Sequence, residues 1–408
     1  MNLNKSLPFF ATVLLGFSVF GSGFALYEPS AAAHALGGAT VGKAVDASAN
    51  FINPATLDDL TNITITVGFV TEHPRCKVNV NGVRDERLDA GLFWLPHFML
   101  AVPLPYGFTL GLGGDAEYGL GTKYDHGWSM EWSTRETTVQ GYVLTPNLSY
   151  AITDDWSVGA GLRWLYFDFE QYSAFPLFGG SQNRLKGNNG FEDIGWQVGT
   201  RYKILDNLSV GLVYKAEIDA TIKGKCTYDP QLSPYLKNGD AHAKMKLPQS
   251  VTGGVNWDIT DTVHLGAAVS WTEWSTFDTL IFNLPKCAVL PTGQKPVGLY
   301  WHDTWRFAIA PSWDFLDDWT FMLSYIYDMD STDSHQTSAM LPPADRHILG
   351  GGFRWRATDN LELTLSYTCI FMAGGDMMTK SPYTGANYRL HSHDGFCHAG
   401  GFSVTYKF

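Results

Sequence analysis

The side chains that most often carry chemistry are few in this sequence, and their spacing fits no catalytic centre. His391 and His393 place two imidazoles on one face of a predicted strand, but no third metal ligand accompanies them. Asp328, Asp330 and Asp333 offer the oxygen atoms that Ca²⁺ prefers, although solvated loop carboxylates are the favoured interpretation. No nucleophile elbow, His-Glu-x-x-His pair or phosphate-binding loop is present. The sequence therefore predicts no enzyme, no cofactor and no metal site.

Five cysteines occur, and no two of them form a Cys-x-x-Cys motif. Cys226 and Cys287 fall in neighbouring predicted external loops, so they are the candidate disulfide. Cys369 and Cys397 are placed symmetrically about the last long loop. Strand parity, however, directs Cys369 outward and Cys397 inward, which argues against their pairing.

Apolar contact is the chemistry that the sequence does supply. Between positions 157 and 169, alternate residues share a face that changes from small and polar to apolar, ending in Leu165, Phe167 and Phe169. Met322 and Ile326 interrupt the polar face of a later segment in the same way. Burying an alkyl chain against such a wall contributes up to ~0.8 kcal/mol per methylene. These five residues are predicted to line a ligand-binding pocket, and packing against an interior plug is an equal alternative.

One cation, Arg163, shares the face of this predicted pocket. A fatty-acid carboxylate removed from water needs such a partner. Asp168 and Glu170 lie close by in the sequence, so a charge pair within the wall is the alternative. Because few other cations suit the role, neutral hydrocarbons also remain candidates for the cargo.

The loop that follows this stretch carries further apolar residues, namely Phe175, Leu177 and Phe178. Exposed contiguous apolar patches usually mark binding sites. We therefore expect an external landing site for a hydrophobic ligand here, the alternative being a loop that folds over a barrel mouth.

Strands are needed to position these residues, and the composition favours them. Aromatic residues make up 14% of the chain, Gly numbers 42, and charged residues reach only 17%, below the roughly 25% of soluble domains. Lys and Arg total 28 against 40 Asp and Glu, which gives a net charge of -12. An acidic chain without a basic run cannot neutralise phosphates, so nucleic acid is excluded as a partner.

Residues 1–25 form a predicted signal peptide. Lys5 precedes an apolar run from position 7 to 20, and Gly23-Phe24-Ala25 supplies small residues at a cleavage site. A retained anchor helix is the alternative. The remaining chain has no apolar stretch of the ~18 residues that a membrane helix requires. The export signal places the mature chain in an oxidising compartment.

The rest of the chain repeats strands with a period of two. Short polar turns such as Thr153-Asp154-Asp155 and Thr260-Asp261-Thr262 alternate with long loops rich in Gly, Pro, Ser and Asn. One face is apolar throughout a typical strand, as in Val263, Leu265, Ala267, Val269 and Trp271. Outward apolar faces, aromatic strand ends and short turns on one side are typical of transmembrane barrels. Residues 62–408 are therefore predicted to form fourteen antiparallel strands, with a soluble β-sandwich as the alternative.

Residues 26–61 do not fit this pattern. They are rich in Ala and Gly, lack period two, and end near Asn53-Pro54-Ala55. They are too apolar to be left in water, so they are predicted to plug the barrel as a small N-terminal hatch. The expected fold is all-β: a 14-stranded antiparallel transmembrane β-barrel plugged by this hatch.

The hatch and its motif resemble the FadL/TodX-type family of outer-membrane transporters for long-chain fatty acids and hydrocarbons. Further segments resemble the family in the same order along the chain, namely Leu247-Pro248, Gly253-Gly254-Val255, Trp271-Thr272-Glu273-Trp274-Ser275, residues 301–306, Tyr327-Asp328 and residues 341–346. The resemblance implies a monomer in the outer membrane of a Gram-negative bacterium. It also implies that the terminal aromatic, Phe408, is read by the barrel-assembly machinery, and that surrounding partners are membrane lipid and a hydrophobic small molecule.

Clustered glycines carry a further implication of the resemblance. Gly111, Gly113 and Gly114 lie within one predicted strand, where such clusters indicate a bulge or kink. In the family, a kink in this strand opens the barrel wall, so a lateral exit is expected here. The function implied is passive uptake of hydrophobic compounds, long-chain fatty acids first and aromatic or aliphatic hydrocarbons second. A general porin for polar nutrients is the alternative from another class.

Overall fold

The protein is described by a computed structural model that covers residues 23–27, 29–175, 180–287 and 289–408. Within these ranges fourteen strands form a closed ring in which every neighbouring pair is antiparallel, as the sequence predicts. The ring strands are β1 (Thr64–Val80), β3 (Phe93–Pro103), β4 (Phe108–Lys123), β5 (Glu136–Ala151), β6 (Trp156–Phe175), β8 (Asp193–Leu205), β9 (Leu208–Lys215), β12 (Ser250–Asp258), β13 (Val263–Thr272), β16 (Thr304–Leu316), β17 (Trp319–Asp328), β18 (Arg346–Arg356), β19 (Leu361–Met372) and β21 (Asn387–Lys407). The ring closes because β21 pairs with β1 along most of its length.

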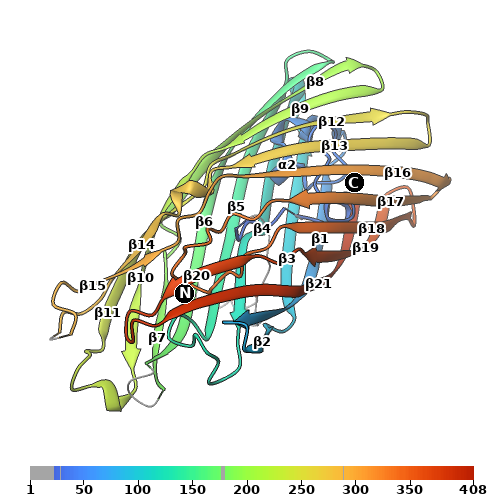
Figure 1. Cartoon of the computed structure of the whole chain (residues 1–408). Helices are drawn as coiled ribbons and strands as arrows, with labels where there is room; N and C mark the ends of the chain where they lie inside the picture. Colours follow the sequence, from blue (N-terminus) through green and yellow to red (C-terminus); the bar gives the residue numbers. More distant parts are fainter. Residues whose placement is uncertain (1–22, 28, 176–179, 288) are drawn as a thin grey trace, which may run out of the picture.

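Shorter strands in the long connections extend the wall at one end of the barrel (Figure 1). They are β2 (Arg84–Asp89), β7 (Ser181–Asn188), β10 (Ile218–Tyr228), β11 (Gly239–Leu247), β14 (Thr279–Asn283), β15 (Gln294–Gly298) and β20 (Asp376–Lys380). β7, β10, β11, β14 and β15 pair successively and continue outward from β6. This end, with its long connections, is the external mouth, and the opposite end carries the short turns.

The outward faces of the ring strands expose large apolar residues between two aromatic levels. Trp156 and Trp164 lie eight residues apart on β6, or about 26 Å of strand, and both are exposed. Trp196 on the neighbouring strand β8 is also exposed and lies opposite Leu162, close to the level of Trp164. Because the strands of such barrels tilt by roughly 35–45°, this span corresponds to a band about 20 Å tall, close to the apolar layer between the aromatic girdles of an outer-membrane barrel. Among the described residues, no helix is long and apolar enough to cross a bilayer.

The N-terminal segment lies inside the ring and contains α1 (Ala31–Ala35), α2 (Ala49–Ile52) and the 3₁₀ helix η1 (Pro54–Asp59). Ser30 caps α1 through its hydroxyl, which accepts a hydrogen bond from the Ala33 backbone N–H at 3.1 Å. Other 3₁₀ helices are η2 (Pro105–Gly107), η4 (Pro230–Leu232) and η5 (Trp274–Thr276). Almost every residue of α1 and α2 is buried, because the barrel wall surrounds them.

In the described structure, the buried N-terminal segment extends ahead of residue 26, where the predicted plug begins. Phe24 and Ala25 are buried, although the sequence assigns them to the signal peptide. The backbone N–H of Gly119 donates to the Phe24 carbonyl at 2.8 Å, and the N–H of Leu26 donates to the Glu117 carbonyl at 2.9 Å. Residues 24–26 are thus tied to β4 by the main chain.

Candidate functional site: a plugged lumen with an aromatic upper half

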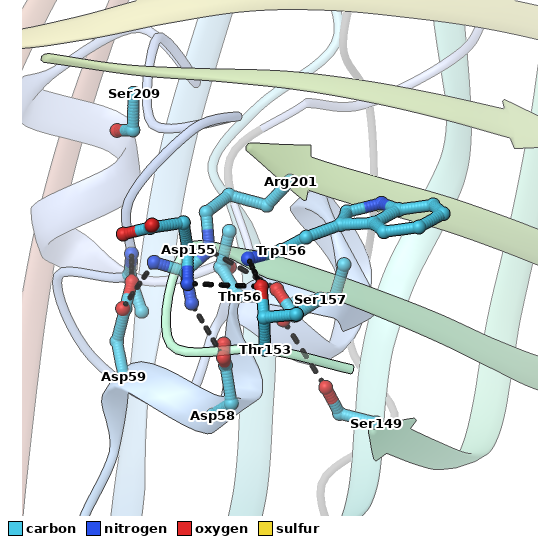
Figure 2. A network of polar contacts seen from close by, with 12 residues as sticks. Thr56, Asp58, Asp59, Ser149, Thr153, Asp155, Trp156, Ser157, Arg201 and Ser209 are labelled. Atoms are coloured by element: carbon cyan, nitrogen blue, oxygen red, sulfur yellow. Dashed lines mark hydrogen bonds and ion pairs between the residues drawn. The ribbon is translucent and has the colours of Figure 1, made fainter. Parts of the chain in front are cut away.

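The lower lumen holds the plug through a buried ionic clamp. Arg201 on β8 contacts Asp58 at 2.5 Å and Asp59 at 3.0 Å, both from η1, and its Nε donates to the Ser157 hydroxyl at 3.1 Å. Figure 2 shows the guanidinium held between the plug and the wall. Asp59 also accepts the N–H of Ala44 at 3.0 Å. Removing any one partner leaves a poorly solvated charge, so this clamp resists displacement of the plug.

The Asn53-Pro54-Ala55 motif packs directly on the barrel wall. The Asn53 side-chain amide donates to the Val41 carbonyl at 2.7 Å and to the Thr200 carbonyl at 3.1 Å. The wall opposite is built from glycines, since a Cβ added to Gly199 would lie 2.0 Å from the Asn53 Oδ1. The plug therefore approaches the wall at backbone distance, which a side chain would prevent.

Met322 and Ile326 occupy the inner face of β17, as parity predicts, but their neighbours belong to the plug. Both are buried in a cluster with Ala35, Leu36 and other small residues of the N-terminal segment. Ile326 is so close to Gly37 that a Cβ there would lie 2.7 Å from it. Met322 and Ile326 therefore pack against the plug, which is the alternative that the sequence offers for them. They lie in a different apolar cluster from Phe167.

Arg163 is directed inward and only 1% exposed, yet its guanidinium already has partners. Its Nη2 contacts Glu117 at 2.8 Å and donates to the Tyr118 hydroxyl at 3.0 Å, and Nη1 donates to the Ala216 carbonyl at 3.0 Å. Lys215 contacts the other oxygen of Glu117 at 2.5 Å. The sequence offers a charge pair in the wall as the alternative, and the structure contains one, but with a carboxylate other than Asp168 or Glu170. Asp168 and Glu170 occupy the other parity of β6 and form no ion pair with Arg163 in the described structure.

The upper lumen is apolar. Leu165, Phe167 and Phe169 point inward and are at most 4% exposed. Phe24 lies at the centre of an aromatic cage, with its ring centroid 4.8 Å from that of Trp274, 5.3 Å from Phe277, 5.9 Å from Trp301, 6.1 Å from Tyr118 and 6.3 Å from Phe167. Mostly edge-to-face contacts of this kind suit aromatic pairs.

Two inward-folded connections cover the external mouth. Residues 124–135 contribute buried Trp128, Met130 and Trp132, and residues 329–345 contribute Met340 and Leu341. The Tyr124 hydroxyl donates to the Ala339 carbonyl at 3.2 Å, joining the two connections.

Below them, a cavity of about 70 Å³ lies beside residues 25 and 26. It has room for a few waters and none for a long alkyl chain.

The barrel wall contains a local separation between β3 and β4. The two strands pair only from Phe98 opposite Gly114 to Pro103 opposite Thr109, whereas β3 continues to pair with β1 as far as Phe93. An isolated bridge between Leu88 and Tyr124 rejoins the wall above. We call this opening in the hydrogen-bond ladder the window.

The plug covers the inner side of the window. Residues 24–26 bond to the edge of β4 that β3 has left. Leu26 packs there in a small cluster with Val70, Phe93, Leu95 and Ala116. The N-terminal segment therefore closes the inner side of the window with main-chain bonds and apolar contacts.

The glycine cluster on β4 has two different structural causes. A Cβ at Gly111 would lie 2.1 Å from the Asn50 side chain, and one at Gly113 would lie 2.5 Å from Phe51, so both glycines admit α2. Gly114 meets nothing closer than 3.9 Å, and pairing with β3 ends there. The bulge on this strand falls later, between Ala116 and Tyr118, opposite β5.

The predicted disulfide is wrong for this structure, because Cys226 and Cys287 are both free thiols. Cys226 is buried within the apolar cluster, while Cys287 lies near the hairpin tip in a bridge with Leu290. The order of the strands predicts that the two loops are neighbours, but it does not determine which residues of the two loops face each other.

The external landing site can be placed only in part. Leu177 and Phe178 lie outside the described residues, and Phe175 ends β6. Residues that sequence reasoning missed include Phe24, Glu117, Trp274 and Trp301. Trp274 and Trp301 lie in segments that carry the family resemblance. That resemblance is the one feature of the sequence that could have pointed to them.

A closed ring whose lumen holds an N-terminal plug, with an apolar upper half and a separated wall, defines a plugged outer-membrane transport barrel. The chain matches the family model described as "Outer membrane protein transport protein (OMPP1/FadL/TodX)" over residues 12–408. It belongs to that family. It is thus an outer-membrane protein of Gram-negative bacteria that transports hydrophobic compounds.

Individual relatives are distant in sequence and close in fold. The long-chain fatty acid transport protein of Escherichia coli K12 is 24% identical over 419 residues, covering 89% of this chain and 91% of that protein. The solved structure of a Pseudomonas aeruginosa FadL homologue has a TM-score of 0.81 at 21% identity, covering 97% of this chain and all of that one. The Pseudomonas putida toluene transporter TodX has a TM-score of 0.72 at 16% identity, covering 94% and 99%. These two structural likenesses concern the fold.

Proposed function

We propose that this protein takes up long-chain fatty acids by passive diffusion and releases them sideways into the outer membrane. The window between β3 and β4 carries the proposal, because a hydrophobic compound gains nothing by entering the aqueous periplasm directly. The upper lumen supports it, since Leu165, Phe167 and Phe169 offer an apolar wall. The similarity to long-chain fatty acid transport proteins favours this cargo.

The proposed route has three steps. A ligand enters from the external side, where we keep Phe175, Leu177 and Phe178 as the landing site. It then displaces Phe24 from the aromatic cage. Withdrawal of residues 24–26 from the edge of β4 finally opens the window next to Ala116 and Phe93. The clamp on Asp58 and Asp59 keeps the rest of the plug in place, so the barrel does not become an open pore.

This route requires that the mature chain keeps Phe24. We infer that the signal peptide is cleaved before Gly23, because Phe24 and Ala25 are buried and bonded to β4. The intact mass of the purified protein tests this directly. A mass that corresponds to a chain beginning at Leu26 contradicts this cleavage site, because the aromatic cage would then lack its central ring.

A reversible cross-link tests the route. Ala25 and Tyr118 are direct bridge partners, so the double variant Ala25→Cys/Tyr118→Cys places two thiols at a distance that a disulfide spans. We expect oleate uptake by cells to fall severalfold when the pair is oxidised and to recover on reduction. The two single variants are the controls. Equal uptake in both redox states contradicts exit past this segment.

Neutral hydrocarbons are the second candidate cargo, because Arg163 is occupied by Glu117 and offers no free charge to a carboxylate. Native mass spectrometry of the purified protein with oleate, hexadecane and toluene separates the two. Retention of oleate supports the proposal, retention of hydrocarbon alone supports the second candidate, and retention of neither, together with high conductance in planar bilayers, supports a polar porin. Phe408, exposed at the end of the closing strand, stays the predicted signal for barrel assembly.

A further inference from the structure

Six cations gather on the outward face of the external extension formed by β7, β10 and β11 (Figure 1). On these strands one set of alternate residues is buried, and it includes Leu185, Ile222 and Ala243 of the apolar cluster in the upper lumen. The other set faces away from the lumen. It contains Arg184, Lys186, Lys223, Lys225, Lys244 and Lys246, all of them exposed or half-buried. The three strands carry two carboxylates, Asp219 and Asp240, so this face is cationic in a chain with a net charge of -12.

The register of the strands brings like charges together on this face. Lys225 on β10 lies directly opposite Lys186 on β7. Like charges directly opposite each other on neighbouring strands destabilise a sheet. Asp240 lies opposite Lys225 on its other side, yet the two form no ion pair in the described structure. Glu170 contacts Arg184 at 2.6 Å and Lys186 at 3.1 Å, so two cations share one carboxylate.

Neighbouring carboxylates neutralise the remaining cations only in part. Lys223 contacts Glu192 at 2.5 Å, and Lys246 contacts Glu217 at 2.8 Å. Lys244 forms no ion pair with any residue that the structure describes. Exposed ion pairs of this kind contribute little, so a multivalent anion can compete for their cations. The face therefore carries positive charge that a ligand with several anionic groups would neutralise.

The cations form a column that rises from the surface of the membrane. Trp196 is exposed at the external aromatic level, and its carbonyl accepts the N–H of Ala216 at 2.9 Å, just before β10 begins. Lys246 lies opposite Asp219, about 10 Å of strand beyond Ala216. Lys225 follows on the same strand face about 30 Å beyond Ala216. The column therefore spans the layer outside the aromatic level, where the head groups of outer-leaflet lipids lie.

We propose that this face binds a phosphorylated glycolipid of the outer leaflet. Lys and Arg are the side chains that bind phosphate, and clusters of about four to eight of them beside a membrane attract anionic lipids. A glycolipid with phosphates spread over an extended sugar head group meets cations at several heights, whereas a phospholipid carries its phosphate at one level. The acyl chains would lie below, against the exposed side chains of Ile194, Trp196 and Leu212. This inference goes beyond the proposed function and does not depend on the cargo.

The test measures lipid binding to the purified full-length protein in detergent. Affinities are compared for rough lipopolysaccharide, for the same lipopolysaccharide after removal of its phosphates, and for phosphatidylglycerol. Lys225→Gln/Lys244→Gln removes the two cations that lack an ion pair, and Lys225→Arg/Lys244→Arg keeps their charge. Lys77→Gln/Lys380→Gln is the matched control, because it removes two exposed lysines from β1 and β20, outside this face.

We expect Lys225→Gln/Lys244→Gln to weaken the binding of intact lipopolysaccharide at least about tenfold. The arginine pair and the control pair should bind it as the wild type does, and the dephosphorylated lipid should bind weakly to all four proteins. Equal affinity in the wild type and the glutamine pair overturns the proposal. An equal loss in the control pair also overturns it, because the effect would then reflect net charge alone. Phosphatidylglycerol that binds as tightly as lipopolysaccharide, and weakens in the same variant, overturns the assignment to a glycolipid.

Discussion

Around the plug, the lower lumen is filled by hydrogen-bonded polar groups, whereas aromatic and aliphatic side chains fill the upper lumen. Arg201 and Asn53 each hold two or more partners at defined distances below. Phe24 above is held by ring contacts with no directional bond of its own side chain. Directional polar contacts specify one position of the plug, while apolar contacts accept any ligand of suitable volume. On the proposed route, the polar lower half seals the barrel, and the apolar upper half is the part that exchanges with the cargo.

The largest expected effect comes from breaking the clamp of the lower lumen. Arg201→Met leaves Asp58 and Asp59 without their cation, which should lower the free energy of unfolding by about 3 kcal/mol and loosen the plug. Urea unfolding and conductance in planar bilayers measure the two consequences. Arg356→Met is the control, because that arginine is largely exposed and reaches Glu362 only at 3.9 Å. If Arg201→Met changes neither the conductance nor the stability, the ionic clamp does not hold the plug in the lower lumen.

The boundary between the halves is tested by a double-mutant cycle on Arg163 and Glu117. We expect each single variant, Arg163→Met or Glu117→Gln, to cost about 2–3 kcal/mol because it strands a buried charge. The double variant should lose less than the sum of the singles. Oleate and methyl oleate affinities should change in parallel in Arg163→Met. A selective loss of oleate would instead make Arg163 a carboxylate-binding residue.

A cavity variant probes the exchangeable upper half. Phe24→Ala should lower stability by about 2 kcal/mol, less than a core Phe at a fixed site because the chain start can relax. Toluene should then raise the melting temperature more in this variant than in the wild type, since apolar cavities bind benzene-sized ligands. Phe98→Ala, on the exposed outer face, is the control. Equal toluene shifts in the three proteins would contradict an aromatic cage that accepts ligand.

The smallest effect concerns the fit of the plug motif against the wall. Gly199→Ala places a methyl group 2.0 Å from the Asn53 side chain, so we expect a loss of about 1–2 kcal/mol in urea unfolding. Gly253→Ala serves as the comparison, because its nearest neighbour lies 3.7 Å away. If the two variants are equally stable, the motif tolerates displacement and the lower half is less rigid than proposed.

Much of the barrel could be predicted because alternation alone identifies the faces of its strands. The inward direction of Leu165, Phe167, Phe169 and Arg163 followed from parity, and the number of ring strands followed from the turns. The ion pair of Arg163 could not be predicted, because Glu117 is 46 residues away on another strand. Parity gives the face of a residue, but its partner depends on the stagger between strands that the closed ring imposes.

The sequence by itself determined the class of fold, the plug segment with its Asn53-Pro54-Ala55 motif, and the outward apolar belt. Each depends on local periodicity or composition, which no distant contact can change. Only the tertiary structure decided that Phe24 lies among the aromatic rings of the upper lumen and that β3 leaves β4 after Gly114. These features arise where segments far apart in the chain meet, and their position is set by the geometry of ring closure.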